Sequence, residues 1–94
     1  MPAISRTVTL ASANGLHARP AQLLAQRAKI SGHRFTITKG DKTANAASLL
    51  ALMSLGAQRG DLLTISSEVA EAEPVLAELE SILATDHDAA EVGS

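Results

Sequence analysis

Cysteine and aromatic residues are almost absent from this sequence of 94 residues, which has no Cys, Trp or Tyr and a single phenylalanine, Phe35. The missing thiols exclude a disulfide framework and thiolate chemistry, and they are compatible with a reducing compartment. With so few rings, stacking on nucleobases is not expected. The core must therefore be built mainly from Leu, Ile, Val and Ala side chains.

An excess of one charge and a long apolar run are also missing. Eight basic and ten acidic residues give a formal net charge of -2, so binding to nucleic acid, which depends on neutralising phosphates, is not predicted. The N-terminal segment "MPAISRTVTL" has no cleavage pattern, and no apolar run reaches the roughly 20 residues that span a bilayer. We expect a soluble cytoplasmic protein without direct membrane insertion.

Hydrophobic periodicity predicts strands and helices within one domain over residues 1–94. Alternation of apolar and polar side chains predicts strands over residues 4–10, 33–38, 43–45 and 62–67. Apolar residues at helical spacing predict helices over residues 18–30, 48–56 and 72–84. Residues from about 85 to 94 have no apolar period, so we expect them to fray and interpret Asp86, His87 and Asp88 as solvating charge.

The predicted element order is βα-ββα-βα, and the strands keep one polar face. Helices stacked on one side of an antiparallel sheet satisfy both patterns and leave the other face of the sheet open to water. The sequence therefore predicts an α+β fold with two layers.

The segment "NGLHARPA" places a histidine where the first helix is expected to begin. If that helix starts at Ala18, His17 occupies the N-cap, a position usually taken by Ser, Thr, Asp or Asn. The amide groups of Ala18 and Arg19 and the helix dipole would form an anion site there. The Arg19 guanidinium can also hold phosphate oxygens, so the segment favours a phosphate site.

The imidazole of His17 can do more than hold an anion. A neutral ring has a nucleophilic nitrogen near pH 7, and a phosphoimidazole would remain in the site built for it. Pro20 fits the first helical turn, and Gly15 lets the preceding loop bend. The alternative that His17 merely caps the helix stays open. A metal site is not predicted, because His17, His33 and His87 lack metal-ligand spacing.

Ser48 begins the second predicted helix, where its plain role is an N-cap. The apolar side chains that follow cannot all be buried by so short a helix; they are Leu49, Leu50, Leu52 and Met53. Part of this stripe is therefore expected to be exposed and to dock partners, with Met53 suited to a surface that meets several of them. Core filling stays open for each of the four.

Two segments together resemble a known family. "NGLHARPA" and, from Ala47, "ASLLALMSLGAQRGD" are similar to HPr, the histidine-containing phosphocarrier of the bacterial phosphoenolpyruvate:sugar phosphotransferase system. The resemblance spans nearly the whole chain. It implies an open-faced β-sandwich, with a four-stranded antiparallel sheet and three helices on one face. It also implies a carrier, not an enzyme, in which His17 takes a phosphoryl group on Nδ1 from phospho-enzyme I and passes it to the IIA domain of a sugar permease.

The resemblance extends to the second segment. In many Gram-positive members the serine that matches Ser48 is a regulatory phosphorylation site, which implies a seryl kinase/phosphorylase and a transcription regulator as further partners. The residues that match Leu49, Leu50 and Met53 help to dock both protein partners. Ala47 departs from the family, because a lysine is common at that position.

Two other functions stay open from the sequence. One is a nitrogen-branch or regulatory HPr paralogue that signals by its phosphorylation state, including at Ser48. The other is a small metal or anion binder that uses the same helix end. The presence of His17 argues against regulatory-only relatives that have lost this histidine. No cofactor is predicted, and we expect a monomer because transient partners need the same face free.

Overall fold

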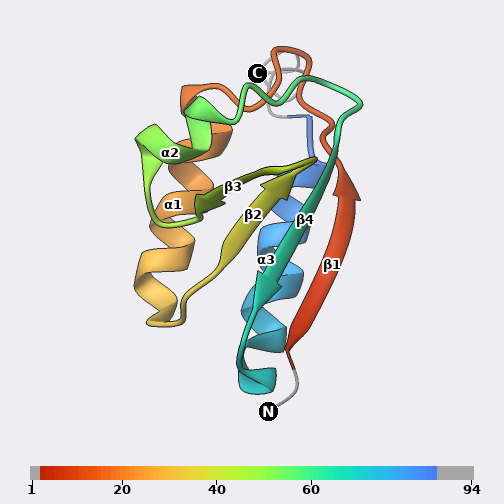
Figure 1. Cartoon of the computed structure of the whole chain (residues 1–94). Helices are drawn as coiled ribbons and strands as arrows, with labels where there is room; N and C mark the ends of the chain where they lie inside the picture. The colour runs from red at the N-terminus through yellow and green to blue at the C-terminus, as the bar shows by residue number, and fades with distance from the viewer. Residues whose placement is uncertain (1–2, 87–94) are drawn as a thin grey trace.

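Strands and helices alternate along the chain in the computed structural model, which describes residues 3–86. The elements of this part are β1 (Ile4–Thr9), α1 (Ala18–Ser31), β2 (Thr36–Lys39), β3 (Lys42–Asn45), α2 (Leu49–Ser54), β4 (Leu62–Ser67), the 3-10 helix η1 (Ala70–Ala72) and α3 (Glu73–Ala84). The predicted order of strands and helices is confirmed (Figure 1).

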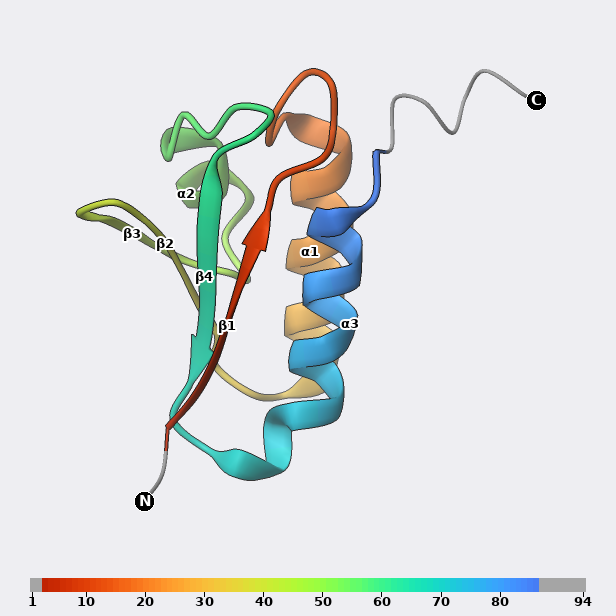
Figure 2. The same ribbon diagram turned by 90° about the vertical axis from the view of Figure 1, so that its right-hand side faces the viewer.

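The four strands form one antiparallel sheet in the order β1-β4-β2-β3. Helices α1 and α3 lie side by side against one face, and the opposite face stays open in the described part of the chain (Figure 2). Helix α2 packs on α1 and on β3. The predicted α+β open-faced sandwich is thus confirmed.

Alternation along the strands separates a buried face from a polar one. Val8 on β1 is paired with Leu63 on β4, and both side chains are buried under the helices. The next pair, Thr7 and Thr64, points to the open face, where the two hydroxyl groups lie 3.2 Å apart. Because successive side chains point to opposite faces of a strand, this register buries Val8, Leu63 and Ile65 and leaves Leu62 exposed.

The core joins the sheet to the helices through aliphatic side chains and one ring. Its largest fully buried members include Phe35, Leu10, Leu24, Ile37, Leu52, Leu63, Ile65, Leu76, Leu79 and Leu83. No helix within residues 3–86 combines the length and the apolar character needed to cross a membrane.

Several boundaries differ by one to three residues from those that the sequence predicts, most of all the start of β2. Strand β2 begins at Thr36 and not at His33, because the backbone N–H of His33 donates to the Ser31 hydroxyl at 3.1 Å and so completes the end of α1. The 3-10 helix η1 precedes α3, so the last α-helix starts at Glu73. A tight turn joins β2 to β3, with Lys39 paired to Lys42.

Candidate functional site

His17 is the N-cap of α1, at the end of the loop that follows β1. Its backbone is extended, with φ -95° and ψ -167°, and its carbonyl accepts a hydrogen bond from the N–H of Ala21 at 3.1 Å. The half-buried side chain makes no capping hydrogen bond to the helix. Capping by the imidazole therefore does not account for a histidine at this position.

The first turn of α1 is suited to an anion. The first amide groups of a helix have no acceptor within the helix, and the dipole places partial positive charge there. Ala18 and Arg19 supply such amides, and the first turn contains no acidic residue that would compete with an anion. The exposed side chain of Arg19 adds a full positive charge to the same turn, whereas Pro20 is buried and anchors the turn to the core.

Gly15 holds the loop before His17 close to the segment that follows α2. Its φ is +74°, and a Cβ at this position would lie 2.5 Å from the carbonyl oxygen of Ala57. The same carbonyl accepts a hydrogen bond from the N–H of Leu16 at 3.0 Å. Both the backbone conformation and the close approach therefore require glycine, and the loop is fixed directly in front of His17.

The end of α3 holds the other side of this loop. Three hydrogen bonds connect them: Ala11 N–H to Leu83 O at 3.0 Å, Ser12 Oγ to Thr85 O at 3.3 Å, and Ala13 N–H to Asp86 Oδ1 at 3.1 Å. The interpretation of Asp86 as mere solvating charge is wrong, because its half-buried carboxylate accepts one of these bonds. Residues 87–94, including His87, lie outside the described residues.

A shallow hollow of about 320 Å³ adjoins the same loop and is lined by Ala13, Asn14, Gly15, Gln58 and Arg59. It places Arg59, a cation that the sequence did not single out, beside the loop that precedes His17. The sequence gives no local indication that Arg59 belongs near the site, because Arg59 lies in a turn that is distant from His17 in the sequence. Backbone hydrogen bonds between Leu16 and Ala57 and between Gly60 and Leu10 bring the two segments together.

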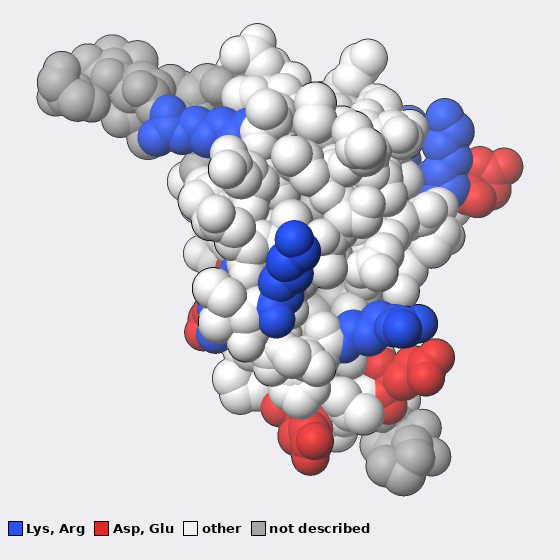
Figure 3. Space-filling view, turned by 90° about the vertical axis from the view of Figure 1, so that its left-hand side faces the viewer, with Lys and Arg blue, Asp and Glu red and all other residues white. Residues whose placement is uncertain are grey.

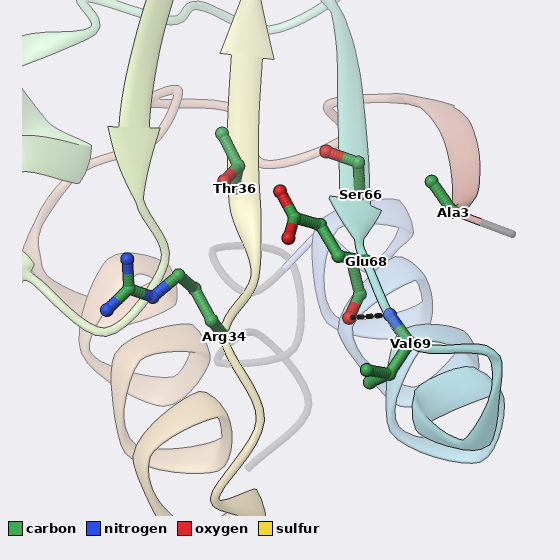
Figure 4. A pocket seen from close by; sticks show the side chains of 7 residues that line it. Ala3, Arg34, Thr36, Ser66, Glu68 and Val69 are labelled. Carbon is green, nitrogen blue, oxygen red and sulfur yellow. Dashed lines mark hydrogen bonds between the residues drawn. The ribbon is translucent and has the colours of Figure 1, made fainter. Parts of the chain in front are cut away.

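A larger hollow of about 510 Å³ lies at the other end of the sheet. It is lined by Ala3, Arg34, Thr36, Ser66, Ser67, Glu68 and Val69, most of which are labelled in Figure 4. Ile4 at the start of β1 is paired with Ser67, whereas the loop to His17 leaves from the opposite end of β1 after Thr9. This hollow therefore contains none of the predicted site residues.

Ser48 caps α2 as the sequence predicts, since its hydroxyl oxygen accepts a hydrogen bond from the N–H of Ala51 at 3.2 Å. Three of the apolar residues after it are exposed: Leu49 at 38%, Leu50 at 79% and Met53 at 42%. Leu52 is fully buried and fills the core. The prediction of a partly exposed apolar stripe is confirmed, and the three exposed residues are called the docking surface below.

The docking surface lies on the same side of the molecule as α1. Figure 3 views the molecule from the side of α1, α2 and β3 and shows a broad uncharged area over its upper part, with Lys and Arg side chains around it. Helix α2 packs on α1, and the segment after α2 is bonded through Ala57 to Leu16, next to His17. The segment that follows the docking surface is thus joined to the residue before His17.

Ion pairs fix the helices that support the site. Arg27 on α1 is hydrogen-bonded to Glu78 on α3, and this bond lowers the pKa of the Glu78 carboxyl below its ordinary value. Arg6 on β1 pairs with Glu73 and, at 2.9 Å, with Glu80 of the same helix. These contacts tie α3, whose end holds the His17 loop, to both α1 and the sheet.

The histidines within the described range do not gather around a metal position. No group of three or more His, Cys, Asp or Glu side chains that could hold a metal ion is present within residues 3–86. The ring of His33 instead stands edge-on to Phe35, with their centroids 6.4 Å apart.

Comparison with known proteins gives one consistent result. The family model described as "PTS HPr component phosphorylation site" matches residues 4–85. The chain is 41% identical over 80 residues to the phosphocarrier protein HPr of Streptomyces coelicolor, covering 84% of this chain and 86% of that protein. It is 35% identical over 81 residues to the phosphocarrier protein HPr of Haemophilus influenzae, covering 86% and 95%.

A solved structure agrees with the sequence relatives. The phosphocarrier protein HPr from Bacillus anthracis superposes with a TM-score of 0.81 at 35% identity, covering 88% of this chain and 99% of that chain. The family model covers the His17 loop, the docking surface and the whole of α3. The chain therefore belongs to the HPr family of phosphocarrier proteins, which relay phosphoryl groups in the phosphoenolpyruvate:sugar phosphotransferase system.

Proposed function

We propose that His17 is the residue of this carrier that is reversibly phosphorylated, on Nδ1. The observation that supports this most strongly is that the imidazole stands at the start of α1 without capping that helix. The Nδ1 lone pair attacks the phosphorus of a phosphorylated donor, and the bond between phosphorus and the donor breaks as the N–P bond forms. Transfer onward repeats these events, with Nδ1 as the leaving group.

The surrounding residues stabilise the transferred group. Negative charge on the phosphoryl oxygens is favoured by the amides of Ala18 and Arg19 and by the Arg19 guanidinium, which has a fork of donors for such oxygens. Gly15 and Pro20 fix the loop and the first turn, so these donors need little rearrangement during transfer. The chain itself turns over no small molecule and is a substrate of its partners.

The partners follow from the family and from the docking surface. Phospho-enzyme I delivers the phosphoryl group and the IIA domain of a sugar permease removes it, both in the cytoplasm. Leu49, Leu50 and Met53 are exposed on α2, and the segment after α2 is bonded to Leu16 beside His17, so the two partners use this surface in turn. A monomer keeps that surface free.

Labelling with radioactive phosphoenolpyruvate tests this function. Wild type, His17→Ala and His33→Ala are incubated with enzyme I and Mg²⁺, and the bound phosphate is treated with acid and with alkali. We expect wild type and His33→Ala to take up acid-labile, alkali-stable phosphate and His17→Ala to take up none, with equal thermal stability. Labelling of a folded His17→Ala would overturn the assignment.

Ser48 supports a second role, as a regulatory phosphorylation site recognised by a seryl kinase and phosphorylase. Its hydroxyl lies at the start of α2, directly before the docking surface. A phosphoserine has a charge of about −1.5 to −2 near neutral pH, and the start of a helix tolerates such a charge. The charge would therefore act on partners, including a transcription regulator, while α2 stays folded.

Two variants separate this switch from a structural effect. Ser48→Asp should slow phosphorylation of His17 by enzyme I while the melting temperature stays near that of wild type, because the carboxylate can still cap α2. Ser48→Ala should lose about 1 kcal/mol of stability with the cap but keep the transfer rate. Equal transfer rates for the two variants, or a large loss of stability in Ser48→Asp alone, would contradict a surface switch.

A further inference from the structure

A continuous path of hydrogen bonds connects the end of α3 to the backbone of His17. We propose that Asp86 is a positioning residue for phosphoryl transfer, which acts by fixing the loop from Ser12 to His17. This role presupposes that His17 is the phosphoryl acceptor. Nothing in the local sequence around His17 indicates it, because the two residues are far apart in the sequence.

The first part of the path joins α3 to the beginning of the loop. The Asp86 carboxylate accepts the N–H of Ala13 at 3.1 Å, and the carbonyl of Thr85 accepts the hydroxyl of Ser12 at 3.3 Å. Ser12 is fully buried, so its hydroxyl cannot exchange this partner for bulk water without moving the loop. Residues 12 and 13 are therefore held from outside the loop.

The second part of the path runs inside the loop. The carbonyl of Ser12 accepts the N–H of Gly15 at 2.9 Å, and the carbonyl of Gly15 accepts the N–H of His17 at 3.0 Å. A displacement at residues 12 and 13 is thus passed on to the residue that starts α1. Misplacing a reacting group by about 1 Å can cost roughly a hundredfold in rate.

The type of residue at position 86 supports a role as acceptor. The C-terminal end of a helix bears partial negative charge, so a basic side chain is favoured there and an acidic one is not. α3 has no basic residue in its last turn, and it is followed by an aspartate at the position that faces the loop. A charge-assisted hydrogen bond to Ala13 offsets this unfavourable placement.

Steady-state kinetics with enzyme I tests the role. Asp86→Ala should lower kcat for phosphorylation of the carrier by roughly tenfold and leave KM unchanged, because the docking surface is intact. Asp86→Asn keeps an acceptor oxygen, so it should restore kcat to within about twofold of wild type. The matched control is Asp41→Ala, which removes an exposed aspartate from the turn between β2 and β3 and leaves the path intact; its kcat should equal that of wild type.

The outcomes separate this role from the proposed function. If wild type is phosphorylated on His17 and Asp86→Ala has the same kcat, Asp86 does not position the loop. The role is also overturned if Asp86→Asn is as slow as Asp86→Ala. The transfer rate would then depend on the negative charge of Asp86 and not on the oxygen that accepts the Ala13 N–H. Absence of phosphate on His17 in wild type would instead contradict the proposed function. The amide resonance of Ala13 should shift in Asp86→Ala and return in Asp86→Asn.

Discussion

At the scale of single residues, Gly15 and Gly32 have nearly the same backbone conformation but different surroundings. Their φ angles are +74° and +77°, yet a Cβ on Gly15 would meet the Ala57 carbonyl at 2.5 Å, whereas a Cβ on Gly32 would have nothing within 4 Å. The cost of a left-handed conformation is thus common to both positions. At Gly15 a side chain would add a steric cost to this conformational cost. Gly15 is also the glycine of the two that lies close to His17 in the sequence.

The pair Gly15→Ala and Gly32→Ala measures that difference. Gly32→Ala should lower the free energy of unfolding by about 1 kcal/mol, from the left-handed conformation alone. Gly15→Ala should lower it by roughly 2 kcal/mol more, because the Ala57 carbonyl must move. Denaturant unfolding of both variants gives the two values. Equal losses would show that the loop can shift freely and that the close approach does not constrain His17.

The role proposed for Arg19 distinguishes it from exposed arginines far from the site. Arg19→Ala should slow transfer to and from His17 by about ten- to a hundredfold without abolishing labelling, because the guanidinium stabilises charge that develops during transfer. Arg34→Ala is the control, since Arg34 is an exposed arginine beyond the far end of α1. Rapid-quench transfer assays measure both. A rate for Arg19→Ala equal to that of Arg34→Ala would contradict a role for Arg19 in the site.

At the scale of elements, α2 and α1 each expose one aliphatic side chain to a similar extent, Leu50 at 79% and Ile30 at 78%. Leu50 belongs to the docking surface, whereas Ile30 lies in the last turn of α1, far along the helix from His17. Exposure alone therefore cannot distinguish them, and neither side chain contributes much to the core.

Replacement of each by serine tests whether the docking surface binds partners. Leu50→Ser should raise the KM of enzyme I for this carrier by about tenfold, because burial of one anchoring side chain in an interface is worth about 1–2 kcal/mol. Ile30→Ser should leave KM unchanged, and both variants should melt near the wild-type temperature. The same KM for the two variants would show that enzyme I does not use this surface.

The elements themselves were largely predictable because burial decides them. Helix α1 follows the spacing of its buried residues, from Ala21 to Ala28, and Ser48 caps α2 through a local hydrogen bond. The start of β2 was not predictable. The alternation of apolar and polar residues predicts a strand from His33, but the N–H of His33 donates to the Ser31 hydroxyl and not to another strand. A period-two pattern shows which face a residue takes but not where a ladder begins.

At the scale of the whole molecule, the parts of the site that the sequence did not reveal depend on contacts between distant segments. Ala13 and Asp86 are 73 residues apart, and the approach of Leu16 to Ala57 joins loops from opposite halves of the chain. His17 and its helix start could be found from local spacing alone. Its supports could not, because the strand order that brings them together has no signature in a single segment.

The bond between Arg27 and Glu78 predicts a pH dependence of stability. Because Arg27 lowers the pKa of Glu78 in the folded state, the unfolded chain binds the proton more tightly. The contribution to stability is therefore fully present above the ordinary carboxyl value of 4.5 and is lost as the pH falls through the lower folded-state pKa. Melting curves from about pH 7 to pH 2.5 should show Glu78→Gln less stable than wild type only at the upper end.

A matched variant checks the origin of that difference. Glu71→Gln removes an exposed carboxylate from η1 and not from the α1–α3 contact, so its melting temperature should follow wild type at every pH. A gap between Glu78→Gln and wild type that persists in acid would show that lost packing, and not the ionised carboxylate, weakens the variant.

Reversible phosphorylation of His17 on Nδ1 is tested most directly by nuclear magnetic resonance on protein with ¹⁵N-labelled histidine. After incubation with enzyme I, Mg²⁺ and phosphoenolpyruvate, followed by removal of the phosphoenolpyruvate, the Nδ1 signal of His17 should show a one-bond splitting by ³¹P. The splitting should disappear when a dephosphorylated IIA domain is added. A splitting on His33 or His87, on Nε2 of His17, or one that persists in the presence of competent IIA domain would contradict the account.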